Sequence, residues 1–264
     1  AQFGAFSPIM QIHGMGKREP WRFEPRTLAI YRAYAQLHTD LFPYLYAAAR
    51  DASERGVPIM RPVAFAFPGD DAWGDTQEHQ YLFGESLLVA PVYVGFNKRK
   101  GVWLPRGEDW FELWTGRRFV GGQTVVVDVP LERIPVFARA GSVVPLLADS
   151  PRTLDCEGDD PLAAWPDLDV LVYPGKDAAF RLTDGTELRW DDAARRLDVT
   201  GSPLRRRVSV HLMDGVGLAM EAHAPGTRNA VGGSPTAVGS VQTDHATSIR
   251  LDATNGRSDD AKEE

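Results

Sequence analysis

The sequence is poor in cysteine, in positive charge and in long hydrophobic runs. Cys156 is the only cysteine among 264 residues, which excludes an intrachain disulfide and a zinc site built on cysteines and favours a cytoplasmic location. Lysine and arginine total 29 against 36 acidic residues, and the net charge of −7 argues against nucleic acid or an anionic membrane as a partner. The longest apolar runs, such as residues 86–94, are far too short to cross a bilayer.

Metal-binding patterns are also missing. His38 and His79 have no partner at the spacing that a metal site needs, so we expect neither a metal nor a cofactor. A neutral small-molecule partner fits this composition best. The sequence leaves the oligomeric state open.

What the sequence does contain is enough apolar residues for a core, with 43% hydrophobic and 10% aromatic content. From Thr27 to Arg55 apolar residues recur at steps of three and four, which predicts a helical region. Pro43 cannot donate a backbone hydrogen bond, so we predict that it kinks or splits this region and opens a second helix that Gly56 ends. Residues 57–67 predict a strand that enters a loop, and helix and strand together indicate an α/β unit.

After Gly84 the chain consists of short apolar segments separated by glycine, proline and aspartate, which is typical of β structure. We therefore place a domain boundary at residue 84 and predict a proximal β-sandwich domain over residues 85–148. A distal β domain is predicted over residues 149–221. Residues 222–264 have too little apolar content to offset chain entropy and are expected to form a disordered tail.

One hairpin of the distal domain can be assigned a register. A two-residue turn at Asp184 and Gly185 would split the apolar residues between both faces. A three-residue loop over residues 183–185, with Gly185 in the left-handed conformation, places four apolar residues on one face. These residues are Phe180, Leu182, Leu188 and Trp190. We prefer the three-residue loop.

Several sequence blocks between residues 4 and 142 follow one another in a fixed order. They are GAFSPIMQIHG (4–14), PW (20–21), LFPYLY (41–46), GVPIMRP (56–62), QYLFG (80–84), LLVAPV (87–92), PL (130–131) and IPVFARAGS (134–142). Any one of these blocks alone is weak evidence of a family resemblance. Together they resemble glycoside hydrolase family 31, of the α-glucosidase and α-xylosidase type, over roughly residues 2 to 147.

The resemblance implies a mixed fold, in which the end of a (β/α)8 TIM barrel is followed by all-β sandwich domains. Because a complete barrel needs about 250 residues, residues 1–84 can supply only its C-terminal remnant. The family's nucleophile and acid/base are aspartates whose surrounding motifs do not occur in this chain. We therefore expect no catalytic residue here, the catalytic aspartates upstream, and no activity from the chain alone.

His13 is the one candidate substrate-binding residue. It matches the position of a family histidine that hydrogen-bonds sugar hydroxyls, and a neutral imidazole offers one donor and one acceptor for this task. The alternative is a histidine that only caps a loop before Gly14. The chain departs from the family nearby, because Gln11 stands where many members have arginine.

Other charged and aromatic residues have simpler interpretations. Asp70, Asp71 and Asp75 follow a Pro-Gly pair and are interpreted as loop charges rather than as the catalytic carboxylates. Arg61 is interpreted as a buried structural arginine that donates to backbone carbonyls. Trp73, like Trp21, could stack on a sugar or pack in the core, and is left unassigned.

The resemblance implies a retaining hydrolase that cleaves terminal glucose from α-glucosides, by a double displacement between two carboxyl groups about 5–5.5 Å apart. An α-xylosidase acting on α-xylosides remains open, because the same blocks occur in both. A non-catalytic carbohydrate-binding β-sandwich module is the alternative of a different class. The α/β segment before Gly84 argues against such a module.

Overall fold

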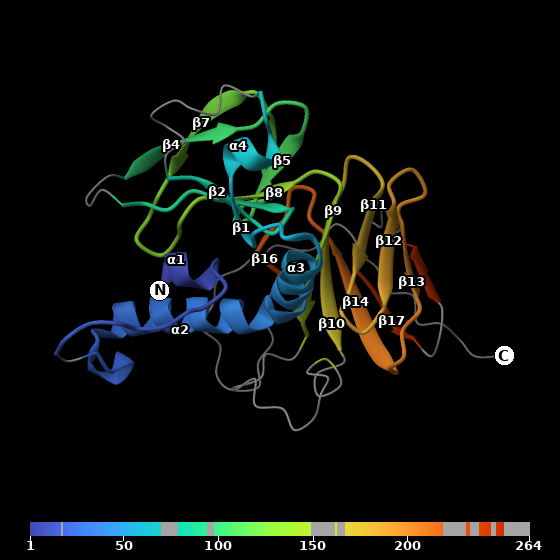
Figure 1. Cartoon of the computed structure of the whole chain (residues 1–264), viewed down its shortest axis with the longest axis horizontal. Coiled ribbons are helices and arrows are strands. Elements are labelled where there is room, and N and C mark those ends of the chain that lie inside the picture. Colours follow the sequence, from blue (N-terminus) through green and yellow to red (C-terminus); the bar gives the residue numbers. More distant parts are fainter. Residues whose placement is uncertain are drawn as a thin grey trace.

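The computed structural model describes residues 1–16, 18–69, 79–93, 98–148, 162, 167–218, 231–232, 238–243 and 247–250. Figure 1 shows two β units side by side, with the two long helices below the first unit and the second of these helices next to the other unit. The helical elements are α1 (Gln2–Ala5), η1 (Pro20–Arg22), α2 (Pro25–Asp40), α3 (Phe42–Arg55) and α4 (Val63–Ala66).

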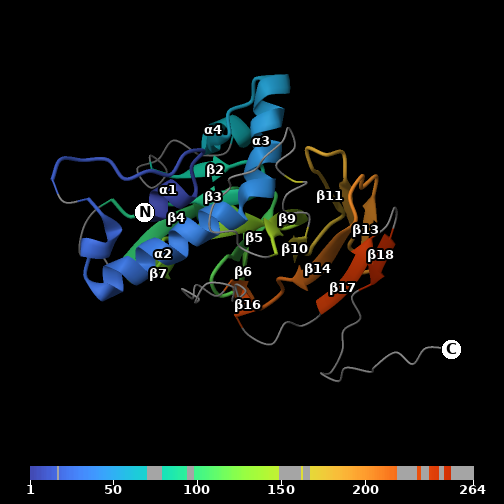
Figure 2. The ribbon, with the colours of Figure 1, turned by 90° about the horizontal axis from the view of Figure 1, so that it is seen from below.

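The predicted break in the long helical region is confirmed. α2 ends at Asp40, and α3 begins at Phe42 with Pro43 in its first turn, where the missing N–H of proline has no intrahelical partner to lose. Gly56 ends α3 in the left-handed conformation, with φ of 69°. Figure 2 shows the two helices running in different directions from their shared corner.

The predicted strand over residues 57–67 is wrong in length. Only Met60–Pro62 form a strand (β1), and Pro62 then caps the short helix α4. β1 pairs antiparallel with β2 (Tyr81–Phe83) rather than with parallel barrel strands. Local apolar content predicted a strand, but the choice of partner depends on residues that are distant in sequence.

β1 and β2 belong to a six-stranded sheet in the order β1-β2-β3-β8-β5-β6, so strands on both sides of residue 84 share one sheet. A separate antiparallel ribbon of β4 and β7 packs on one face of this sheet. The bounds are β3 (Leu87–Val89), β4 (Arg99–Leu104), β5 (Asp109–Glu112), β6 (Arg118–Val120), β7 (Gln123–Asp128) and β8 (Val136–Arg139). Their shared core includes Leu82, Leu88, Val102, Leu104, Trp110, Val125 and Phe137.

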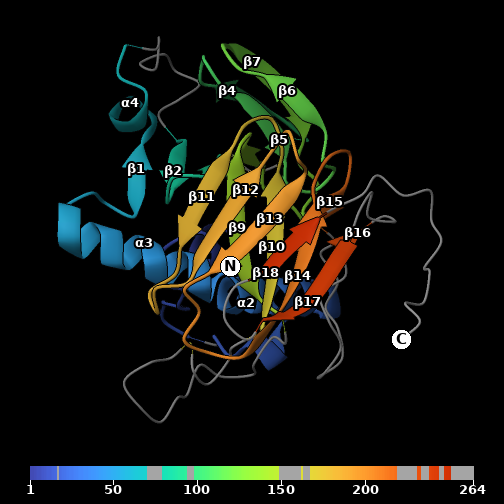
Figure 3. The ribbon, with the colours of Figure 1, turned by 90° about the vertical axis from the view of Figure 1, so that its right-hand side faces the viewer.

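The second β unit is a sandwich of two four-stranded sheets, in the orders β17-β14-β10-β9 and β11-β12-β13-β18 (Figure 3). Its strands are β9 (Ser142–Leu147), β10 (Leu168–Tyr173), β11 (Ala178–Arg181), β12 (Glu187–Asp191), β13 (Arg196–Thr200), β14 (Arg206–Leu212), β17 (Val238–Thr243) and β18 (Thr247–Arg250). A short pair of β15 (Gly217–Leu218) and β16 (Val231–Gly232) stands apart. Inward-facing residues of both sheets form one apolar core, as alternation along a half-buried strand requires.

The hairpin between β11 and β12 has the predicted register. Phe180 pairs with Leu188, and the Leu182 N–H donates to the Thr186 carbonyl, which leaves a loop of residues 183–185. Gly185 has φ of 92°. The four apolar residues therefore share the face that packs into the sandwich core.

Three stretches of residues 222–264, where a disordered tail was expected, form strands in the structure, namely β16, β17 and β18. β17 pairs with β14, and β18 pairs with β13, so the tail completes one edge of each sheet. Composition did not predict these strands, because a segment with few apolar residues can still form backbone hydrogen bonds to the exposed edge of an existing sheet. Of these strands, Ile249 lies in the core.

A third apolar core joins the helices to both β units. It contains residues of α1, α2 and α3 packed on the other face of the six-stranded sheet and against β9 and β10. Buried phenols anchor the helices, since Tyr34 Oη donates to the Glu132 carbonyl at 3.1 Å and Tyr81 Oη to the Phe6 carbonyl at 2.8 Å. Burial raises the pKa of both phenols, which keeps them protonated as donors.

Candidate functional site: a polar junction between the helices and the two β units

His13 lies in an extended segment between α1 and η1, and its side chain is exposed. Within the described part of the chain no hydrogen bond to His13 is found, so the loop-capping alternative gains no support. Ile9, Met15 and Trp21 of the same segment are also exposed, which places His13 on an open surface of this chain. Its role as a substrate contact stays a prediction.

Several other residues considered in the sequence fall outside the described residues. These are Asp70, Asp71, Trp73, Asp75 and Cys156. Among the residues that the structure describes, no group of three or more histidine, cysteine or acidic side chains could hold a metal ion.

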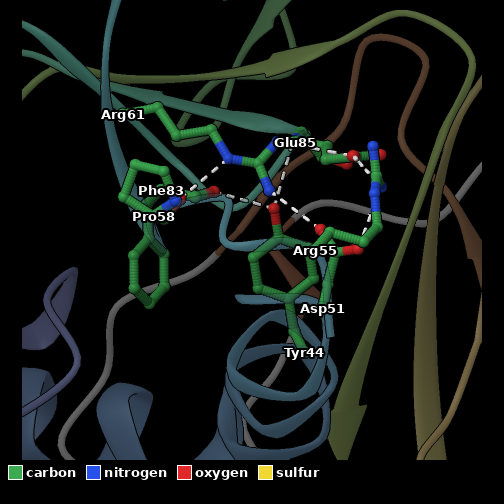
Figure 4. Close-up of polar contacts among 8 residues, drawn as sticks. Tyr44, Asp51, Arg55, Pro58, Arg61, Phe83 and Glu85 are labelled. Atoms are coloured by element: carbon green, nitrogen blue, oxygen red, sulfur yellow. Dashed lines mark hydrogen bonds and ion pairs between the residues drawn. The ribbon is translucent and has the colours of Figure 1, made fainter. Parts of the chain in front are cut away.

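Arg61 is the centre of a polar cluster between α3 and the turns of the first sheet. Its side chain is 7% exposed, and its Nε donates to the Pro58 carbonyl at 2.9 Å, as the structural interpretation predicted. The guanidinium also contacts Asp51 Oδ2 at 3.2 Å and Glu85 Oε1 at 3.4 Å. Arg55 contacts the same two carboxylates, so two arginines and two acids compensate one another (Figure 4).

The Tyr44 hydroxyl lies beside this cluster and ties α3 to the β2–β3 turn. It donates to the Phe83 carbonyl at 2.8 Å and accepts the Ser86 N–H at 3.0 Å (Figure 4). Burial raises the pKa of Tyr44 to about 12. Gly84 takes the left-handed conformation between these two anchors, with φ of 63°.

A second ion cluster links the first sheet to the sandwich. The Glu108 carboxylate accepts hydrogen bonds from Arg139 at the end of β8 and from Lys176 in the β10–β11 turn. Burial alone would raise the pKa of Glu108, but the two cationic donors outweigh it, so the pKa lies below its ordinary value. The carboxylate is therefore ionised at neutral pH.

The two clusters border one cavity of about 490 Å³ at the junction of α3, the six-stranded sheet and β11. It is lined by Tyr44, Asp51, Arg61, Glu85, Arg139, Lys176, Phe180 and Arg181, among others. The sequence by itself predicted no binding role for any of them. No local signal marks them, because they come from segments up to 137 residues apart in the sequence, from Tyr44 to Arg181.

Comparison with known families identifies two successive segments. Residues 1–48 match the model of the glycosyl hydrolases family 31 TIM-barrel domain, and residues 56–144 match that of the glycosyl hydrolase family 31 C-terminal domain. The chain belongs to glycosyl hydrolase family 31. The matches confirm the expected order, with the end of a barrel followed by β domains, and the change between them falls near the end of α3.

Similar family 31 proteins include glycosidases of two specificities. The chain is 35% identical over 191 residues to an alpha-xylosidase of Saccharolobus solfataricus, covering 72% of this chain and 25% of that protein. It is 34% identical over 213 residues to human neutral alpha-glucosidase AB, covering 77% of this chain and 22% of that protein. The crystal structure of a family 31 alpha-xylosidase from Xanthomonas citri superposes with a TM-score of 0.75 at 32% identity. The match covers 94% of this chain and 28% of that one.

This family 31 chain thus spans about a quarter of the length of these relatives. None of its described helices combines the length and the apolar character that crossing a membrane demands.

Proposed function

We propose that this chain is the C-terminal part of a retaining glycosidase that releases terminal glucose from α-glucosides, with its catalytic aspartates on barrel strands upstream. The observation that supports this best is the succession of a barrel match and a C-terminal-domain match in one chain. The helices α2 and α3 share a core with both β units, which fits an integral part of a larger enzyme better than a separate carbohydrate-binding module. A cytoplasmic location belongs to the same proposal, and the single cysteine supports it.

We further propose a change to the domain division. Because β1, β2 and β3 share a sheet, the barrel remnant ends before β1, and the proximal domain begins near residue 56 rather than 85. β9 pairs with β10 and so belongs to the distal sandwich, although it precedes residue 148. An α-xylosidase is the second candidate, because two of the compared relatives bear that name.

The first prediction concerns where catalysis resides. We expect the purified chain to hydrolyse neither nitrophenyl α-glucoside nor nitrophenyl α-xyloside, because it lacks the nucleophile and the acid/base of the double displacement. The full-length protein, with the upstream barrel, should turn over one of the two with retention at the anomeric carbon, which proton NMR of the first-formed sugar measures. The ratio of the two rates decides between glucosidase and xylosidase. Turnover by the chain alone above a heat-killed sample would contradict the proposal.

The second prediction tests His13 in the full-length protein. His13→Ala should lower kcat/KM roughly two- to tenfold, because a lost hydrogen bond to an uncharged hydroxyl costs about 0.5–1.5 kcal/mol. Met15→Ala is the matched control, since Met15 lies two residues away in the same segment and is fully exposed. The thermal midpoint of both variants should equal that of the parent protein. An unchanged kcat/KM for His13→Ala would assign this residue a structural role only.

A further inference from the structure

We infer that the cavity at the junction of α3, the six-stranded sheet and β11 binds one sugar unit of a neutral oligosaccharide. Its volume of about 490 Å³ lies within the range of small-molecule sites, about 300–1,000 Å³. The choice of a saccharide rests on the proposed glycosidase function. The cavity itself lies entirely within this chain.

The apolar lining of the cavity includes two aromatic residues. Phe180 of β11 stacks on Tyr44 of α3, with ring centroids 5.7 Å apart and an interplanar angle of 22°, and both line the cavity. Tyr44 is held in place by its two hydrogen bonds to the β2–β3 turn, and Phe180 is half-buried. Tyr44 is only 2% exposed and lies stacked against Phe180, so the partly exposed Phe180 ring is the one that suits the C–H face of a pyranose.

Four of the five cationic side chains that line the cavity are paired with carboxylates, Arg181 being the exception, and this favours a neutral ligand over an anion. Arg55 and Arg61 are paired with Asp51 and Glu85. Arg139 and Lys176 share the Glu108 carboxylate. Such pairs present fixed donors and acceptors side by side, and each sugar hydroxyl can both donate and accept.

Backbone groups at the edge of a sheet add further hydrogen-bonding capacity. β11 is an edge strand, and Phe180 and Leu182 occupy the positions that bond to β12. By the alternation of an antiparallel ladder, Ala179 and Arg181 direct their N–H and C=O groups away from β12. Both residues line the cavity, and the structure gives the Arg181 guanidinium no ion pair or hydrogen bond with a described residue.

An aromatic surface, compensated charges and free edge groups therefore converge on one cavity. β11 has only four residues, so a peptide that extended the sheet at this edge would gain few backbone hydrogen bonds. A compact ligand that is rich in hydroxyls uses all three features.

Binding is tested on the purified chain by titrating the ¹⁵N-labelled protein with maltotriose, isomaltotriose and xylobiose. We expect saturable shifts of the Ala179 and Arg181 amides for at least one sugar. Arg181→Ala should weaken binding roughly fivefold or more, as the loss of one hydrogen bond implies. Ala48→Trp, which fills the cavity from α3, should abolish it. Arg189→Ala is the matched control, because Arg189 is an exposed arginine on neighbouring β12, pairs with Glu187, and does not line the cavity.

The absence of saturable shifts, or shifts that Ala48→Trp and Arg181→Ala leave unchanged, would overturn the assignment. Equal weakening by Arg189→Ala would also overturn it, since that would show a nonspecific effect of charge. The titration does not depend on catalysis. A negative result therefore leaves the proposed glycosidase function standing, and an inactive full-length protein leaves a positive titration standing.

Discussion

Replacing Asp184 by alanine is expected to lower the free energy of unfolding of the sandwich by about 3–5 kcal/mol, because it removes a buried carboxylate that pairs with a buried guanidinium. Arg206 on β14 is 0% exposed and Asp184 in the β11–β12 loop is 1% exposed, so water can replace neither partner. Asp184 also accepts the Thr186 N–H at 2.8 Å and so shapes the loop. Trp190 on the adjoining strand reports unfolding by its fluorescence in a urea titration.

A matched control lies on the same hairpin. Glu187 and Arg189 form an ion pair whose side chains are 36% and 64% exposed, and pairs of this kind are worth about 0–1 kcal/mol. Glu187→Ala should therefore change stability little. Asp184→Asn keeps an acceptor for the Thr186 N–H and separates the loss of charge from the loss of the turn. If Asp184→Ala cost no more than Glu187→Ala, the buried pair would contribute nothing beyond a surface pair.

Gly84→Ala is expected to destabilise the junction by about 2–5 kcal/mol, as the sum of backbone strain and overpacking. The backbone at Gly84 is left-handed, and an added Cβ would lie 2.7 Å from Cζ of Tyr44, well inside van der Waals contact. The ring cannot move away freely, since its hydroxyl is bonded on both sides of the glycine. Denaturant unfolding of the purified chain measures the effect.

Gly56 provides the control, because its φ of 69° nearly equals that of Gly84 and a Cβ there meets nothing within 4 Å. Gly56→Ala should cost about 1 kcal/mol, from backbone strain alone. In a Tyr44→Phe background, Gly84→Ala should lower the free energy of unfolding by less, because the Tyr44 hydroxyl oxygen is then absent. That oxygen is the atom nearest to the added Cβ. If Gly84→Ala and Gly56→Ala lowered the free energy of unfolding of the parent protein equally, Tyr44 would not restrain the β2–β3 turn.

The features that the sequence predicted correctly are local ones. The break at Pro43 and the end of α3 at Gly56 follow from the missing N–H of proline and the freedom of glycine, which act within one helical turn. The register of the β11–β12 hairpin follows from four apolar residues on strands joined by a three-residue loop. For such features the interacting residues are neighbours in the chain.

Tertiary structure alone decided which distant segments meet. β1 joined the β2 edge instead of a barrel strand, and two stretches of the tail completed the sandwich edges, because an exposed strand edge accepts any segment that reaches it in register. The junction cavity arises in the same way, since Arg61, Lys176 and Phe180 come together only when α3, the first sheet and β11 pack on a shared core. Periodicity and turn chemistry carry no information about such pairings, because their energy depends on packing between residues far apart in the chain.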